Sequence, residues 1–93
     1  MKKILEEDGW RGFLETCLRA KSVKELSDLF RLFMTHTERE EMASRFLIIR
    51  ELLKGEKTQR EIARDLDVSI AYITRGSNEL KIIGPDLRKF LEK

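Results

Sequence analysis

The sequence predicts an all-α protein of about six short helices, and three observations lead to that prediction. Apolar residues recur three and four positions apart, which places them along one side of a helix. Helix-capping patterns stand in front of several of these runs. No segment alternates apolar and polar residues as a half-buried strand does. With 93 residues, the chain is expected to form a single domain over residues 1–93.

Composition fits a globular protein and excludes several classes. Hydrophobic residues make up 41% and charged residues 39% of the chain. No apolar run approaches the roughly 20 residues of a membrane-spanning helix, and the N-terminal segment lacks the apolar stretch of a signal peptide. A single cysteine and a single histidine exclude an internal disulfide and any multi-thiolate or paired-histidine metal site. We therefore expect a reduced, cytoplasmic protein that needs no metal and no cofactor.

Catalysis is not expected either. Cys17 lies in an apolar stripe, which is typical of packing rather than of a nucleophile. His36 stands between two threonines at the start of a helix. Neither Cys17 nor His36 has an evident catalytic partner in the sequence. The sequence therefore predicts no enzyme and no catalytic residues.

Two amphipathic helices open the chain. The first has Asp8 as its candidate N-cap, and the second has Ser22 and Glu25 at the spacing of a capping box. Their stripes are Trp10, Phe13, Leu14, Cys17 and Leu18 in the first helix and Leu26, Leu29, Phe30, Phe33 and Met34 in the second. One small subunit can hardly cover so many large side chains, so we expect a homodimer. A compact monomeric bundle is the alternative.

The third helix is expected to be central. Thr37 and Glu40 again have the spacing of a capping box, and the run 38–53 is apolar on more than one side. Lys54 and Gly55 provide the end of the helix, as a cation in the last turn and a residue suited to the left-handed cap.

Residues 58–81 have the spacing of a helix-turn-helix. Thr58 and Glu61 form a capping box, and Ala63 is small where two helices would cross closely. Asp67 lies in the turn, where aspartate tolerates the left-handed conformation better than most residues, and Ser69 is the expected cap of the second helix. The second helix of such a unit enters the DNA major groove. An ordinary two-helix corner is the alternative.

The start of that second helix is the expected DNA-reading surface. If Ile73 points inward, the short residues around it face outward and can approach base edges closely. The charge distribution agrees, since residues 1–53 are neutral overall and residues 54–93 carry the whole net charge of +2. The DNA-binding candidates are Gln59, Arg60, Ser69, Ile70, Ala71, Tyr72 and Thr74.

A short last helix is expected to begin at Pro85, the residue type favoured at a first helical position. Leu87, Phe90 and Leu91 would form its buried side. With this helix, the expected dimerisation elements are residues 8–54 and 85–92.

Several motifs together resemble the Trp repressor family. They are Thr37-Glu-Arg-Glu40, Arg45, Glu51-Leu-Leu-Lys-Gly-Glu56, Thr58-Gln-Arg-Glu61 and Ile73-Thr-Arg-Gly-Ser-Asn-Glu-Leu-Lys81. The resemblance covers about residues 29–92, and the run Ile-Thr-Arg-Gly-Ser-Asn is its most specific part. It implies a DNA-binding repressor of tryptophan biosynthesis or uptake genes, with L-tryptophan as a regulatory ligand rather than a cofactor. It also implies an intertwined homodimer.

The resemblance also implies a site for that ligand. Arg45 and Arg75 would enclose the indole ring, with Arg75 also facing the ligand carboxylate. Backbone carbonyls near residues 32–35 would meet the ammonium group, and Gly76 would leave space for the ligand. The corepressor candidates are Leu32, Met34, Thr35, Arg45, Arg75, Gly76 and Glu79.

Several positions depart from the family pattern, among them Tyr72 and the turn Asp67-Val68-Ser69, which replaces a glycine-rich turn. Glu79 replaces a small hydroxyl residue and could either pair with the ligand ammonium or point to solvent. Ala63 replaces a lysine that contacts DNA in relatives, so one phosphate contact is expected to be missing. A ligand-independent helix-turn-helix protein remains an alternative function, and a helical interaction module without nucleic acid is another.

Overall fold

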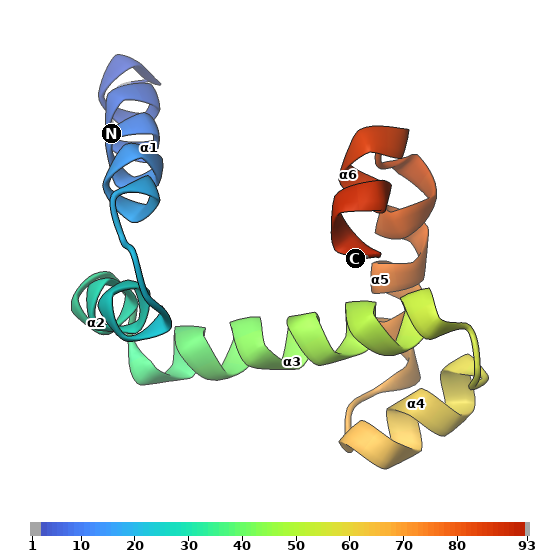
Figure 1. The fold of residues 1–93 in the computed structure, drawn as a ribbon. Coiled ribbons are helices and arrows are strands. Elements are labelled where there is room, and N and C mark those ends of the chain that lie inside the picture. Colours follow the sequence, from blue (N-terminus) through green and yellow to red (C-terminus); the bar gives the residue numbers. More distant parts are fainter. Residues whose placement is uncertain (1–2, 93) are drawn as a thin grey trace. The chain divides into compact units, whose positions relative to one another are not determined.

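The computed structural model describes residues 3–92, and these form six helices and no strand (Figure 1). The helices are α1 (Lys3–Leu18), α2 (Val23–Phe33), α3 (His36–Lys54), α4 (Gln59–Leu66), α5 (Ile70–Ile82) and α6 (Pro85–Leu91). The predicted all-α class is confirmed. The chain divides into two compact units within α3, one ending at Arg39 and the other beginning at Glu40. Each unit is described by itself.

The N-terminal unit is held together by aromatic contacts between α1 and α2. The Phe13 ring lies 5.8 Å from both the Trp10 and the Phe30 ring centroids and stacks on each. It meets Phe33 edge-on at 5.5 Å. Yet Trp10 is 63% exposed, and no described residue of this unit is fully buried. The single chain therefore brings these rings into contact but does not bury them.

Two of the expected caps in this unit differ from the structure. Asp8 lies inside α1, so its prediction as the N-cap was wrong; the helix already begins at Lys3. Ser22 caps α2 as predicted, accepting a hydrogen bond of 3.1 Å from the Glu25 amide. The Glu25 carboxylate, however, accepts from the amide of Lys21 rather than from that of Ser22.

The start of α3 also lies earlier than predicted. Thr35 Oγ1 accepts from the Glu38 amide at 3.1 Å, and Glu38 Oε1 accepts from the Thr35 amide at 2.8 Å. The predicted pair Thr37 and Glu40 was wrong, because both pairs share the same spacing and the first satisfies the free amides. The helix therefore begins at His36. Its end is as predicted, with Gly55 in the left-handed region at φ 67°.

The core of the C-terminal unit joins α3, α4 and α5. It consists of Ile48, Ile62, Ala63 and Ile73, and Leu52, Leu66, Val68 and Tyr72 pack against it. Ile62 and Ile73 are completely buried. Ala63 lies among them, as its small size predicted for a close helix crossing. This core fixes which sides of α4 and α5 face outward.

The last helix differs from its prediction in burial. Pro85 opens α6 as predicted, and Arg88 Nη2 donates to the Leu80 carbonyl at 3.3 Å. Leu87 and Phe90, however, are 49% and 73% exposed, and Leu91 is exposed as well. The predicted buried side of this helix is therefore not covered within the single chain. Among residues 3–92, no helix is long and apolar enough to cross a membrane.

Candidate functional site

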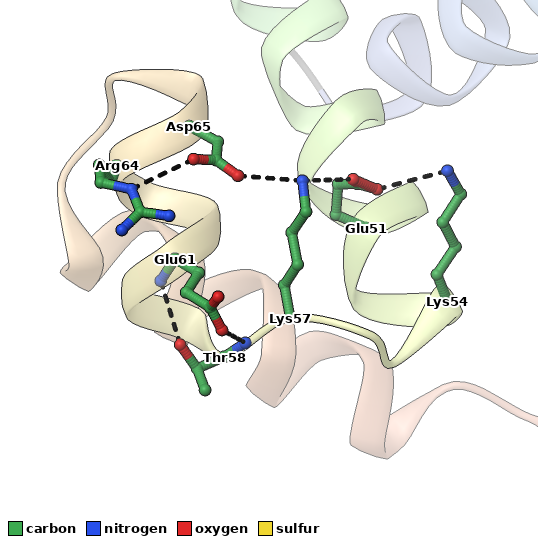
Figure 2. A network of polar contacts seen from close by, with 7 residues as sticks. All are labelled: Glu51, Lys54, Lys57, Thr58, Glu61, Arg64 and Asp65. Carbon is green, nitrogen blue, oxygen red and sulfur yellow. Dashed lines mark hydrogen bonds and ion pairs between the residues drawn. The ribbon is translucent and has the colours of Figure 1, made fainter.

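Local interactions build the helix-turn-helix as its sequence predicted. Thr58 Oγ1 accepts from the Glu61 amide at 3.1 Å, and the Glu61 carboxylate accepts from the Thr58 amide at 2.9 Å (Figure 2). Asp67 ends α4 in the left-handed conformation, at φ 55°. Ser69 then caps α5, with its hydroxyl accepting from the Tyr72 amide. These interactions set the turn between the two helices.

Ion pairs fasten α4 to the end of α3. Lys57, in the connecting segment, reaches Glu51 of α3 at 3.4 Å and Asp65 of α4 at 3.0 Å (Figure 2). Lys54 also approaches Glu51, at 3.6 Å, and Arg64 approaches Asp65, at 3.3 Å. One ammonium group thus joins carboxylates from two helices. This network was not predicted, because Glu51, Lys57 and Asp65 lie on two helices and the segment between them, which only the fold brings together.

The network shifts the pKa values of its members. Burial would raise the pKa of Glu51, but the hydrogen bond from Lys57 and the charges of Lys54 and Lys57 outweigh that effect and lower it. The hydrogen bond to Asp65, followed by that to Glu51, raises the pKa of Lys57. The Lys57 bond, followed by that of Arg64, lowers the pKa of Asp65. All of these groups therefore carry their charges at neutral pH, and the network is intact.

The outer side of the helix-turn-helix carries most of the DNA-binding candidates. Ser69, Ala71 and Thr74 of the turn and α5 are exposed, as is Arg60 of α4, and Ile70 is 47% exposed. Thr74 Oγ1 lies 2.8 Å from Gln59 Oε1 and 3.0 Å from the Ile70 carbonyl oxygen, and its one proton can be donated to either acceptor. The side-chain contact places the half-buried Gln59 beside the outer side of α5, where its NH₂ group suits a phosphate oxygen.

A pocket of about 280 Å³ lies between α3 and α5. It is lined by three charged side chains, all exposed to solvent: Arg45, Arg75 and Glu79. Its remaining lining residues are Ile48, Ile49, Tyr72 and Gly76. The volume is close to the lower limit of roughly 300 Å³ for small-molecule sites, so it suits a compact ligand. Four of the seven corepressor candidates thus share one pocket.

Gly76 has a packing role at this pocket. A Cβ atom added there would lie 3.3 Å from Ile48 Cγ2 and 3.5 Å from Leu52 Cδ1. The glycine therefore lets α5 lie close against α3, in addition to any space that it leaves for a ligand.

Tyr72, one of the predicted DNA-reading residues, also lines this pocket. Its half-buried ring packs against the core cluster. Its hydroxyl accepts a hydrogen bond of 3.1 Å from Arg45 Nε. The two residues are 27 positions apart, so only the fold could bring them together.

The remaining corepressor candidates belong to the N-terminal unit. Leu32 is 76% exposed, and Thr35 is engaged in the cap of α3. The Met34 carbonyl accepts a hydrogen bond of 2.8 Å from Arg39 Nη1, so a guanidinium cation already contacts this oxygen. Residues 3–92 hold no group of three or more histidine, cysteine or acidic side chains that could bind a metal ion.

Sequence comparisons agree with this architecture. The family described as Trp repressor protein matches residues 8–93. A Trp operon repressor homolog of Chlamydia trachomatis serovar D is 54% identical over 91 residues, which cover 98% of this chain and 97% of the relative. The corresponding homolog of Chlamydia caviae is 55% identical and covers 99% of this chain and 91% of the relative. That of Vibrio vulnificus strain YJ016 is 46% identical and covers 88% and 80%. The chain therefore belongs to the Trp repressor family.

Proposed function

We propose that this protein is a DNA-binding transcriptional repressor that L-tryptophan activates as a corepressor. Its targets are operators of tryptophan biosynthesis or uptake genes, and it acts on them in the cytoplasm as a homodimer. Family membership supports a tryptophan-repressor-type regulator rather than an enzyme.

The chemistry of the pocket carries this proposal. A free aromatic amino acid has a carboxylate, an ammonium group and a flat apolar ring. The guanidinium groups of Arg45 and Arg75 suit the carboxylate and the ring face, and Glu79 suits the ammonium group. The apolar side chains of Ile48 and Ile49 offer a surface for the ring. The Met34 carbonyl, another candidate partner of the ammonium group, already accepts a hydrogen bond from the Arg39 cation. The carboxylate of Glu79 is therefore the better partner for the ammonium group of the ligand.

Exposed apolar surface supports the homodimer. Leu32 and Phe33 of α2, Phe46 of α3 and Phe90 of α6 are all more than half exposed in the single chain. Both units therefore expose large apolar side chains, and a second copy would cover them.

The ligand acts by shifting a population of conformations. A two-fold symmetric dimer must place its two α5 helices in successive major grooves, about 34 Å apart. Tryptophan between α3 and α5 favours the arrangement with that spacing. Its effect on DNA affinity equals the difference between its affinities for the two arrangements.

Isothermal titration calorimetry with L-tryptophan tests the proposal. We expect saturable binding, and Arg75→Ala should weaken it by roughly 1.5–3 kcal/mol, the contribution of a hydrogen bond to a charged group. Arg60→Ala is the matched control. It removes an arginine outside the pocket, so it should leave tryptophan binding unchanged while weakening DNA binding.

Two results would contradict the proposal. No heat with millimolar L-tryptophan would remove the corepressor. Equal affinity for a two-fold symmetric duplex with and without tryptophan, measured by gel shift, would instead favour a ligand-independent helix-turn-helix protein.

A further inference from the structure

The hydrogen bond between Tyr72 and Arg45 joins the first turn of α5 to α3. The Tyr72 ring is held at one end by the core cluster. At the other end, its hydroxyl accepts from Arg45 Nε at 3.1 Å. An exposed arginine on a helix ordinarily samples many rotamers, whereas this one is attached to a ring that the core holds in place.

The direction of this bond preserves the part of Arg45 that a ligand needs. The Nε–H group lies in the plane of the guanidinium, so an acceptor on it approaches the edge of the group. Both flat faces stay available for stacking on an aromatic ring. Because Arg45 lines the pocket, the bond orients this stacking surface without covering it.

We propose that Tyr72 is a positioning residue of the ligand pocket, whose hydroxyl holds the Arg45 guanidinium in place before the ligand arrives. The inference rests on the proposed binding of L-tryptophan in this pocket. It gives Tyr72 a role different from the base reading that its place near the start of α5 suggested. The other candidates on α5, such as Ile70 and Thr74, keep that role.

Tyr72→Phe tests the role, because it removes the hydroxyl and retains the ring in the core. Ordering a free, long side chain on binding corresponds to a loss of roughly two- to tenfold in affinity. Calorimetry should therefore give a dissociation constant for L-tryptophan that is roughly two- to tenfold higher in the variant. Circular dichroism should show the same helix content and a similar melting temperature in both proteins.

DNA binding at saturating tryptophan separates positioning from DNA reading. The probe is a two-fold symmetric duplex selected by the unaltered protein, with tryptophan, from a random library. Tyr72→Phe should bind it with unchanged affinity and need only more tryptophan to do so. Thr74→Val is the matched control, since it also removes one hydroxyl from α5. It should weaken DNA binding and leave tryptophan binding unchanged.

The hydrogen bond itself can be observed without ligand. In ¹⁵N NMR spectra of the ligand-free protein, the Nε proton of Arg45 should exchange with water more slowly than in Tyr72→Phe. The Nε proton of Arg50, whose guanidinium lies over the Phe46 ring on the same helix, should be unaffected and serves as the internal control.

Each contrary outcome has a distinct meaning. Unchanged tryptophan affinity in Tyr72→Phe, or equal exchange at Arg45 in both proteins, would overturn the positioning role alone. Tighter tryptophan binding would also overturn it, because the hydroxyl would then compete with the ligand for Arg45. Weaker DNA binding at saturation would return Tyr72 to DNA reading. Absence of tryptophan binding by the unaltered protein would refute the proposed function, and this inference with it.

Discussion

Two isoleucines of α5 offer a direct test of which side of this helix faces inward. Ile73 is completely buried in the core, whereas Ile70, one turn earlier, is 47% exposed. Replacing either with alanine removes the same three carbon atoms from the same helix. Any change in intrinsic helix propensity is therefore common to both variants and cancels in the comparison.

The expected losses of stability follow from burial. Three buried carbons at about 0.8 kcal/mol each give about 2.4 kcal/mol for Ile73→Ala. The cavity left in a core adds to this, for a total of about 3–4 kcal/mol. Ile70 is about half exposed in the folded chain, so its replacement loses only about half of the free energy of burying three carbons and leaves no closed cavity. We therefore expect Ile70→Ala to lower the free energy of unfolding by about 1 kcal/mol.

Urea unfolding at a fixed protein concentration measures the difference. With a slope of roughly 1–3 kcal/mol per M, a difference of about 2–3 kcal/mol places the two midpoints about 0.7–3 M apart. The effects on DNA affinity should have the opposite order. Under conditions in which both variants are folded, Ile70→Ala should weaken DNA binding more than Ile73→Ala does. Equal losses of stability would refute the assignment of Ile73 to the inner side and Ile70 to the outer side.

Three further predictions concern the helix-turn-helix and its attachment. Thr58→Ala should lower the free energy of unfolding by about 1 kcal/mol, because the cap of α4 is lost; thermal melting measures it, and no change would argue against the capping box. Asp67→Gly should raise stability by about 0.5 kcal/mol, while Asp67→Val should lower it by more than about 1 kcal/mol, since a β-branched residue is strained at φ 55°. Glu51, Glu61 and Asp65 have lowered pKa values, so their stabilisation is present above the ordinary values of 4.5 for glutamate and 3.8 for aspartate and is lost as the pH falls below these values. Melting curves between pH 3 and pH 6 should show that loss, and a loss of the same size in Lys57→Met would contradict the role of the network.

Local sequence determined the features of the fold that were predicted correctly. The caps at Ser22, Thr58 and Ser69 depend on residues no more than three positions away. The same holds for Asp67, whose left-handed conformation follows from the turn around it. The start of α3 was missed because two overlapping patterns satisfy the same rule, and only the folded backbone selects Thr35.

The site could be predicted only in part, because its residues meet through the fold. Arg45 and Arg75 come from helices that are separate in the sequence, and the family resemblance, not their spacing, suggested the pairing. Tyr72 carries no signal for a pocket residue, since its partner is 27 positions away. Lys57 meets its two carboxylates in a similar way, since Glu51 of α3 and Asp65 of α4 lie on different helices that only the fold brings together.

The open aromatic cluster of α1 and α2 has a consequence for how the cell controls such a regulator. In the proposed homodimer, the rings around Phe13 are covered only when two chains meet, so folding follows the law of mass action. When synthesis slows, the fraction of unpaired chains rises and proteases gain access to them. Repression would then fade faster than dilution by growth alone could explain, and gene expression would respond sharply to a modest fall in copy number.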